Sequence, residues 1–202
     1  MRIIELFYPT ENNIKFYSLK LSHDKNISIY DSIEVFKKNI AANPDFIHKE
    51  ITEKIPLNNI ITLHNTTGIQ SISRIKSMIK DIKLKKDIFS DDGFPNIKLV
   101  KTKDNKWIIF DGHHTILAYM AIGKRFLYEI PHMIVKNQDK EHVSNDEIIV
   151  FFGEHKNKIK PEDWKNYTIN WQAEKQKQLC KRIQNNIGEL FESIKNKIKN
   201  GQ

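Results

Sequence analysis

Residues 107–123 read WIIFDGHHTILAYMAIG, and this stretch decides the fold because it joins an apolar strand to a helix. It begins with four apolar or aromatic residues, which is typical of a buried strand, and its second half repeats apolar side chains at helical spacing. Gly123 stands where the glycine that ends a helix belongs. The stretch therefore predicts a strand, a turn at Asp111 and Gly112, and a helix over residues 113–122.

The segments on either side extend this unit to the order strand, helix, two strands, helix, strand. Residues 72–82 predict a helix, because apolar side chains recur three and four apart after Ser71 and Ser73, either of which can cap its start. The two middle strands are separated by a short polar turn, as in a hairpin. This order predicts an α/β fold, a small mixed sheet with helices packed on it. The strands are expected at residues 55–61, 97–100, 107–110 and 130–135.

The chain divides into three segments by the character of its sequence. An N-terminal segment, 1–54, holds two apolar runs around a turn and a short helical pattern, which we expect to pack on the core. The core, 55–136, is followed by a C-terminal extension, 137–202, which ends in an amphipathic helix from Gln172 onward. The apolar stripe of that helix must pack on something, either the domain itself or a partner chain. The N-terminal hairpin and helix are expected at residues 2–8, 14–19 and 32–40.

Length and composition are those of a soluble globular protein. The 202 residues are 39% hydrophobic and include a single cysteine, Cys180, which lies in the apolar stripe of the C-terminal helix. One cysteine cannot form an internal disulfide, which favours a reducing compartment. No stretch reaches the length of a membrane span, and the first residues lack the apolar run of a signal peptide. We therefore expect a cytoplasmic protein with no membrane partner.

Positive charge is concentrated in the C-terminal quarter. The net charge is +8, and residues 155–202 contain eleven Lys or Arg against five Asp or Glu. Such a surplus is either an electrostatic footprint for nucleic acid or the solvated face of a lysine-rich helix. Trp164, Tyr167 and Trp171 stand among these lysines, where they either stack on bases or pack against the domain.

The turn at Asp111 and Gly112 carries the chemistry expected of this chain. The first N–H groups of a helix have no partner within the helix, and its dipole places partial positive charge there. Gly112 lets the backbone approach a ligand, while His114 and Thr115 offer donors from the first helical turn. Asp111 is suited to bind Mg²⁺, to accept a proton or to hold a substrate hydroxyl, and His113 lies beside it. The pattern predicts a phosphate site with an acidic neighbour.

A zinc site is not expected in this chain. Consecutive residues on a helix diverge by about 100°, so His113 and His114 do not converge on one ion. The sequence contains neither a Cys-x-x-Cys nor a His-Glu-x-x-His motif, the usual sources of zinc ligands. The turn instead favours Mg²⁺ arriving with a nucleotide, held by Asp111 and phosphate oxygens.

Three short motifs between residues 55 and 135 are shared with a known superfamily. They are Ile55-Pro56-Leu57 at the opening strand, Asp111-Gly112-His113-His114 at the start of a helix, and Ile130-Pro131 at the closing strand. In these motifs the core resembles the ParB/sulfiredoxin superfamily, which implies nucleotide binding with the phosphates over the N-terminus of that helix. Branches of this superfamily bind CTP and DNA, activate a sulfinate with ATP, or phosphorylate free serine. The Asp-Gly-His-His form is most similar to the serine kinase branch.

The chain departs from that superfamily at three places. Thr115 stands where an arginine usually contacts the phosphates, so the candidates to replace it are Lys124, Arg125 and a lysine of the C-terminal segment. His113 occupies the position of the sulfiredoxin cysteine, which argues against sulfinate reduction. The loop after the opening strand lacks the carboxylate of the serine kinases, so a kinase here needs another base, from within the core or outside it. The candidate catalytic residues are Asp111, His113 and His64.

Three hypotheses of function emerge from these observations. The leading one is a nucleotide-dependent phosphotransferase that uses ATP or another nucleotide with Mg²⁺ on a small hydroxyl-bearing substrate. The second is a ParB-like module that binds or cleaves DNA, with the basic C-terminal quarter as its electrostatic contact. The third is a non-catalytic fold that binds a partner through the C-terminal helix, a second copy of the chain included.

Overall fold

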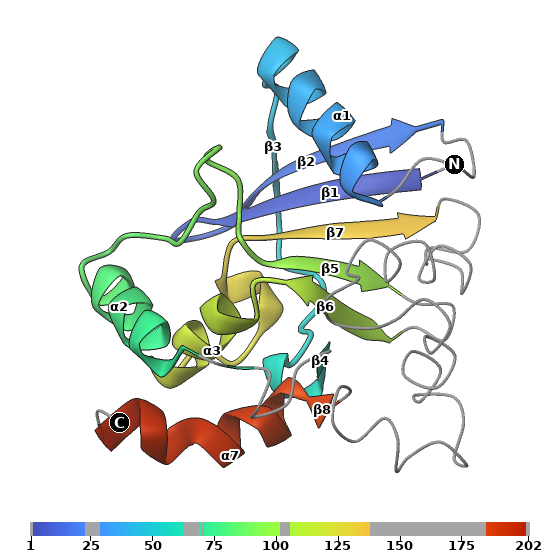
Figure 1. The fold of residues 1–202 in the computed structure, drawn as a ribbon. Helices are drawn as coiled ribbons and strands as arrows, with labels where there is room; N and C mark the ends of the chain where they lie inside the picture. The colour runs from blue at the N-terminus through green and yellow to red at the C-terminus, as the bar shows by residue number, and fades with distance from the viewer. Residues whose placement is uncertain are drawn as a thin grey trace, which may run out of the picture.

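The computed structural model describes residues 2–22, 29–62, 69, 71–101, 106–137 and 185–200 (Figure 1). His64 and the loop around it lie outside these residues, as do Cys180 and the three aromatic residues of the basic quarter. No helix in the described ranges combines the length and the apolarity needed to span a bilayer.

A mixed sheet of eight strands forms the centre of the described molecule, in the order β3-β2-β1-β7-β5-β6-β4-β8. The pairs β5–β7 and β4–β6 are parallel, and the other neighbours are antiparallel. The predicted α/β class with a mixed sheet is therefore confirmed. The strands are β1 (Arg2–Pro9), β2 (Ile14–Leu21), β3 (Ile47–Lys49), β4 (Ile61–Thr62), β5 (Lys98–Lys101), β6 (Trp107–Asp111), β7 (His132–Asn137) and β8 (Asn185–Asn186).

Helices cover both faces of this sheet. One face carries α1, which lies over β1 and β2, and the opposite face carries α2, α3 and α7 (Figure 1). Two short 3-10 turns, η1 and η2, precede β4 and β7. The bounds are α1 (Ile29–Ala42), α2 (Ile72–Lys83), α3 (His113–Ala121), α7 (Ile187–Asn200), η1 (Leu57–Asn59) and η2 (Leu127–Glu129).

The sheet separates two apolar cores, and the alternation of side chains along a strand decides which core each one enters. On β6, Ile108 and Phe110 face the α1 side, whereas Ile109 faces the helices of the opposite side. A strand that is buried on both faces needs apolar residues at successive positions. This requirement explains the uninterrupted apolar run at the start of the stretch 107–123.

The predicted N-terminal hairpin and helix are confirmed, each within a few residues, as β1, β2 and α1. β1 also pairs with β7, in a register that sets Ile4 opposite Val135. Residues 2–21 and the core segment therefore contribute to one continuous sheet.

The described part of the C-terminal helix packs on the chain itself. Ile187, Leu190, Ile194 and Ile198 on α7 are buried in the same core as α2 and α3. At these four positions the apolar stripe packs on the domain itself and not on a partner chain. The stretch 172–184, where the sequence predicts the first turns of this helix, lies outside the described residues.

The opening strand predicted at residues 55–61 is mostly wrong. Pro56 makes only an isolated bridge to Phe126, η1 follows it, and the strand itself is confined to β4. Proline has no N–H to donate to a neighbouring strand, so it does not continue a ladder. The next N–H, that of Leu57, donates to the Arg125 carbonyl at 2.8 Å.

The first turn of α2 is capped by Ser71 and not by Ser73, because the Ser71 hydroxyl accepts the Arg74 N–H at 3.2 Å. Replacing this cap removes the acceptor of an otherwise unsatisfied donor. We expect Ser71→Ala to lower the free energy of unfolding by about 1 kcal/mol. Urea unfolding measures this change, and Ser73→Ala, an exposed position in the first turn, is the matched control. Equal losses in the two variants would contradict the assignment of the cap.

Candidate functional site

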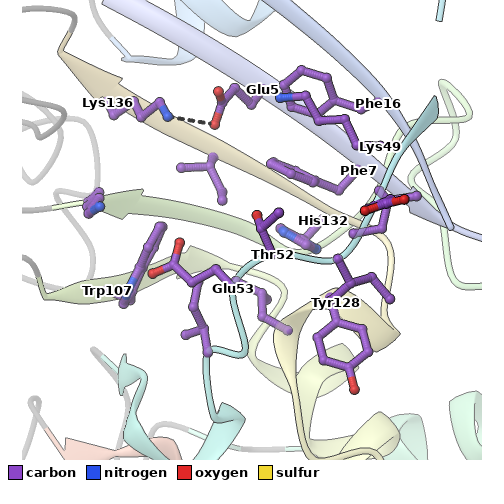
Figure 2. A pocket seen from close by; sticks show the side chains of 17 residues that line it. Glu5, Phe7, Phe16, Lys49, Thr52, Glu53, Trp107, Tyr128, His132 and Lys136 are labelled. Atoms are coloured by element: carbon purple, nitrogen blue, oxygen red, sulfur yellow. Dashed lines mark ion pairs between the residues drawn. The ribbon is translucent and has the colours of Figure 1, made fainter. Parts of the chain in front are cut away.

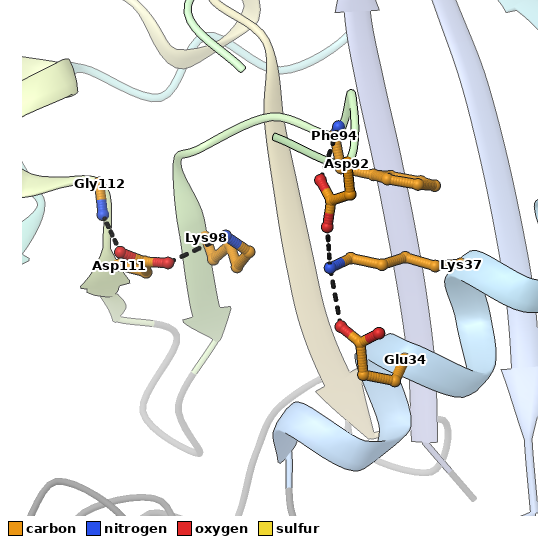
Figure 3. Close-up of polar contacts among 7 residues, drawn as sticks. All are labelled: Glu34, Lys37, Asp92, Phe94, Lys98, Asp111 and Gly112. Carbon is orange, nitrogen blue, oxygen red and sulfur yellow. Dashed lines mark hydrogen bonds and ion pairs between the residues drawn. The ribbon is translucent and has the colours of Figure 1, made fainter. Parts of the chain in front are cut away.

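β6 ends in an irregularity that turns the Asp111 side chain toward β5. Lys98 is opposite Asp111, but Leu99 is opposite Ile109, so Phe110 is an extra residue on β6. Such a bulge re-aims the side chains next to it. Its effect here is that Asp111 meets the Lys98 ammonium across the two strands (Figure 3).

The Asp111 carboxylate is held in a defined orientation by two donors. The Lys98 ammonium lies 2.9 Å from Oδ2, and the Gly112 N–H donates to Oδ1 at 2.8 Å (Figure 3). The Lys98 side chain is only 7% exposed, whereas that of Asp111 is 43% exposed. Each carboxylate oxygen has a second lone pair. The group is therefore oriented from the protein side and remains open to a hydroxyl or a cation from the solvent side.

Gly112 is required by its own protein neighbours. Its φ is +88°, and a Cβ at this position would lie 2.7 Å from both the Asn96 carbonyl oxygen and the Ile97 Cα. The expected purpose of this glycine was close approach to a ligand, but the backbone before β5 occupies that side. Its N–H, the first amide expected to face an anion, already donates to Asp111.

The first turn of α3 is packed more deeply than the sequence suggests. His113 and Thr115 are buried, and the Thr115 hydroxyl lies 3.8 Å from the Met78 sulfur on α2. That hydroxyl therefore faces a neighbouring helix and not an incoming phosphate. His114 is half-buried as a residue, but its ring Nε2 atom is buried as well.

Lys124 and Arg125, predicted as substitutes for the arginine that Thr115 replaces, lie beyond the far end of α3. The helix has nine residues, and at 1.5 Å per residue its two ends are about 13 Å apart. Both residues line a different pocket, together with Phe191 and Lys195. The structure thus gathers Asp111, Gly112, His113 and His114 at one place and leaves these two cations elsewhere.

The cation that does accompany the turn is Lys98, which is not among the residues expected at the site from the sequence. Its one signal in the sequence is a lysine inside the otherwise apolar run at 97–100. A lysine in a buried strand requires a compensating group, because an isolated buried ammonium is costly. The identity of that group could not be found without the register of β5 and β6.

A second ion pair braces the loop before β5. The Lys37 ammonium on α1 contacts both Asp92 and Glu34 (Figure 3). Burial tends to raise the pKa of Asp92, but hydrogen bonds from Lys37 and from the Phe94 N–H outweigh it and lower that pKa. The resulting contacts hold the loop that leads into Ile97 and Lys98, and so help to place the lysine beside Asp111.

Asp111 is the carboxylate that this turn offers to a metal ion. In the part of the chain that the structure describes, no group of three or more His, Cys, Asp or Glu residues lies close enough to bind a metal ion. Mg²⁺ that arrives with a nucleotide is commonly held by one or two carboxylates together with phosphate oxygens. The half-exposed carboxylate of Asp111 suits that kind of site.

Comparison with models of protein families, with curated proteins and with solved structures finds no match to this chain. The fold class is therefore defined by the sheet and its helices alone.

Proposed function

We propose that this protein binds a Mg²⁺-nucleotide at the turn between β6 and α3, as a phosphotransferase with a ParB/sulfiredoxin-like core. The observation that carries the proposal is the Asp111 carboxylate, oriented by Lys98 and by the Gly112 N–H yet 43% exposed. A carboxylate fixed in this way is prepared to hold a cation or a hydroxyl without further reorganisation.

The position of the turn in the fold favours a phosphate as the neighbour of this carboxylate. β4 and β6 are parallel neighbours, and ligands of α/β proteins commonly bind beyond the carboxyl ends of parallel strands. α3 begins there, and the partial positive charge at the start of a helix favours anions. The buried ammonium of Lys98, on β5, lies beside this turn and balances the charge of Asp111.

Phosphoryl transfer gives each of these groups a role. The hydroxyl oxygen of a small substrate attacks the terminal phosphorus, the bond from phosphorus to the leaving phosphate oxygen breaks, and the hydroxyl proton passes to Asp111. His114 and the start of α3 hold the transferred phosphate, and Lys98 keeps the carboxylate in place. Positioning and charge stabilisation supply most of the catalysis in such reactions. The resemblance to the serine kinases supports free serine as the first acceptor to test.

Calorimetry with ATP, ADP and CTP in the presence of Mg²⁺ tests the binding step. We expect Asp111→Asn to weaken binding of the preferred nucleotide about tenfold or more, because a charge-assisted contact is lost. The amide oxygen can still accept a hydrogen bond from Lys98 or Gly112, but the buried Lys98 ammonium loses its counter-charge, which costs stability. Circular dichroism therefore checks that the variant is folded before its binding is compared with that of the wild type. Asp45→Asn, an exposed carboxylate in the loop between α1 and β3, is the matched control.

His114→Ala tests the proposed phosphate contact of the same site. We expect this variant to weaken nucleotide binding both with and without Mg²⁺, because the contact is to phosphate and not to the metal ion. If the wild-type protein binds none of the three nucleotides, the proposal is overturned. Transfer of phosphate to serine is monitored by ³¹P NMR. If a nucleotide binds but no phosphate reaches serine, the nucleotide site is retained and serine is excluded as the acceptor.

A further inference from the structure

A second concave site lies on the sheet, away from the turn at Asp111. It is a pocket of about 300 Å³ over β1 and β7, beside η2, and residues 49–53 form its outer wall (Figure 2). This volume is at the lower end of the range for small-molecule sites. None of the residues from Asp111 to Thr115 lines it.

The inner wall of this pocket is a stacked pair of rings. The His132 ring lies on the Phe7 ring, with centroids 4.6 Å apart and an angle of 6° between the planes. His132 is only 2% exposed. Trp107, Phe16 and Tyr128 add further aromatic surface around the same space (Figure 2). A flat ring therefore finds partners of its own shape in this pocket.

His132 supplies one directional polar group in these aromatic surroundings. Its Nδ1 lies 2.8 Å from the Ile130 carbonyl oxygen, and because a carbonyl only accepts, Nδ1 carries the hydrogen. In the described residues Nε2 makes no hydrogen bond. Burial lowers the pKa of His132 to about 4, so at neutral pH the ring is uncharged and Nε2 is an acceptor.

The charged rim of the pocket is balanced. Lys136 pairs with Glu5 at 3.0 Å, and the Lys49 ammonium lies 3.5 Å from the centroid of the Phe16 ring. Positive and negative side chains are equal in number around the opening, so no strong net charge selects an anion or a cation. The charged residues of the rim are Lys49, Lys101, Lys136, Glu5, Glu50 and Glu53.

We propose that this pocket binds a small planar heteroaromatic molecule, uncharged or zwitterionic, that donates an N–H to Nε2 of His132. The ring of the ligand stacks among the aromatic side chains, and the single donor fixes its orientation. The proposal is independent of the nucleotide site, because the two sites share no residue.

Indole is a suitable probe, because it is a flat heteroaromatic ring with one N–H, and 1-methylindole is the same ring without the donor. We expect ¹H–¹⁵N NMR titration to show saturable shifts around His132 and Trp107 with indole. Binding of 1-methylindole should be about tenfold weaker, because Nε2 is then left buried without a donor. Thr52→Trp should abolish the shifts, because Thr52 lines the pocket and the larger side chain fills it. Lys54→Trp is the control and should leave the shifts unchanged, because Lys54 is also exposed but does not line the pocket.

His132→Phe separates the acceptor from the stacking surface. In this variant we expect indole to bind still, and the preference for indole over 1-methylindole to disappear. Three results would each overturn the proposal: no saturable shift with indole, equal binding of the two probes to the wild-type protein, or unchanged binding by Thr52→Trp. Indole shifts centred on the turn at Asp111 would likewise contradict it.

Discussion

Gly112→Ala is expected to lower the free energy of unfolding by about 3 kcal/mol, from two causes that act together. The left-handed backbone at Gly112, with φ +88°, disfavours any residue that has a Cβ. The new methyl group would also lie 2.7 Å from backbone atoms of Asn96 and Ile97, and backbone does not move aside as a flexible side chain does. If the proposed nucleotide site is correct, binding is expected to be lost as well, because any shift of the turn displaces the Asp111 carboxylate.

Urea unfolding of the wild type and of two alanine variants measures this effect. Gly123→Ala is the matched control, because Gly123 also has a positive φ, +98°, but a Cβ added there would meet nothing within 4 Å. The control isolates the conformational cost, about 1 kcal/mol. Similar losses in both variants would show that the contact with Asn96 and Ile97 is not what makes Gly112 necessary.

Acid is expected to destabilise the protein through His132 by about 3 kcal/mol between pH 7 and pH 4. Burial lowers the pKa of this histidine in the folded protein from 6.5 to about 4. Well above pH 6.5 the ring is neutral in both the folded and the unfolded state, so it does not change the free energy of unfolding there. As the pH falls, the unfolded chain takes up the proton first, so unfolding becomes progressively more favourable until the folded state is protonated as well.

The free energy of unfolding measured by urea at several pH values tests this expectation. Carboxylates titrate in the same range, so the informative quantity is the difference between the wild type and His132→Phe, whose ring has no proton to bind. We expect the variant to lose less stability on acidification. His48→Gln, at an exposed position on β3, should follow the wild type. Parallel curves for the wild type and His132→Phe would contradict the buried neutral state of His132.

Elements with a strong local period were predicted well. The hairpin of β1 and β2, the helix α2 and the helix α3 each depend on residues within a few positions of one another. The region around Pro56 was predicted poorly, because its apolar residues fit a strand by composition while proline removes a donor from the ladder. Apolar periodicity alone does not report such a missing bond.

The candidate site was predictable in its centre and not in its surroundings. The glycine turn, the acid before it and the histidines after it are consecutive in sequence, so a local pattern reveals them. Lys98 is brought to Asp111 by strand register and by a bulge, and Thr115 is turned to Met78 by the packing of α2 on α3. Both depend on contacts between elements that are separate in the chain.

The amino-acid sequence by itself determines the mixed α/β class and the strand–glycine–helix turn. Both arise from the short-range spacing of apolar side chains and from one backbone position that favours glycine. The tertiary structure alone decided which charges meet there, with Lys98 beside Asp111 and Lys124 and Arg125 at the opposite end of α3. It also decided that His132 stacks on Phe7. Strand pairing and helix packing are set by the burial of the whole chain, so they bring together residues that no local pattern relates.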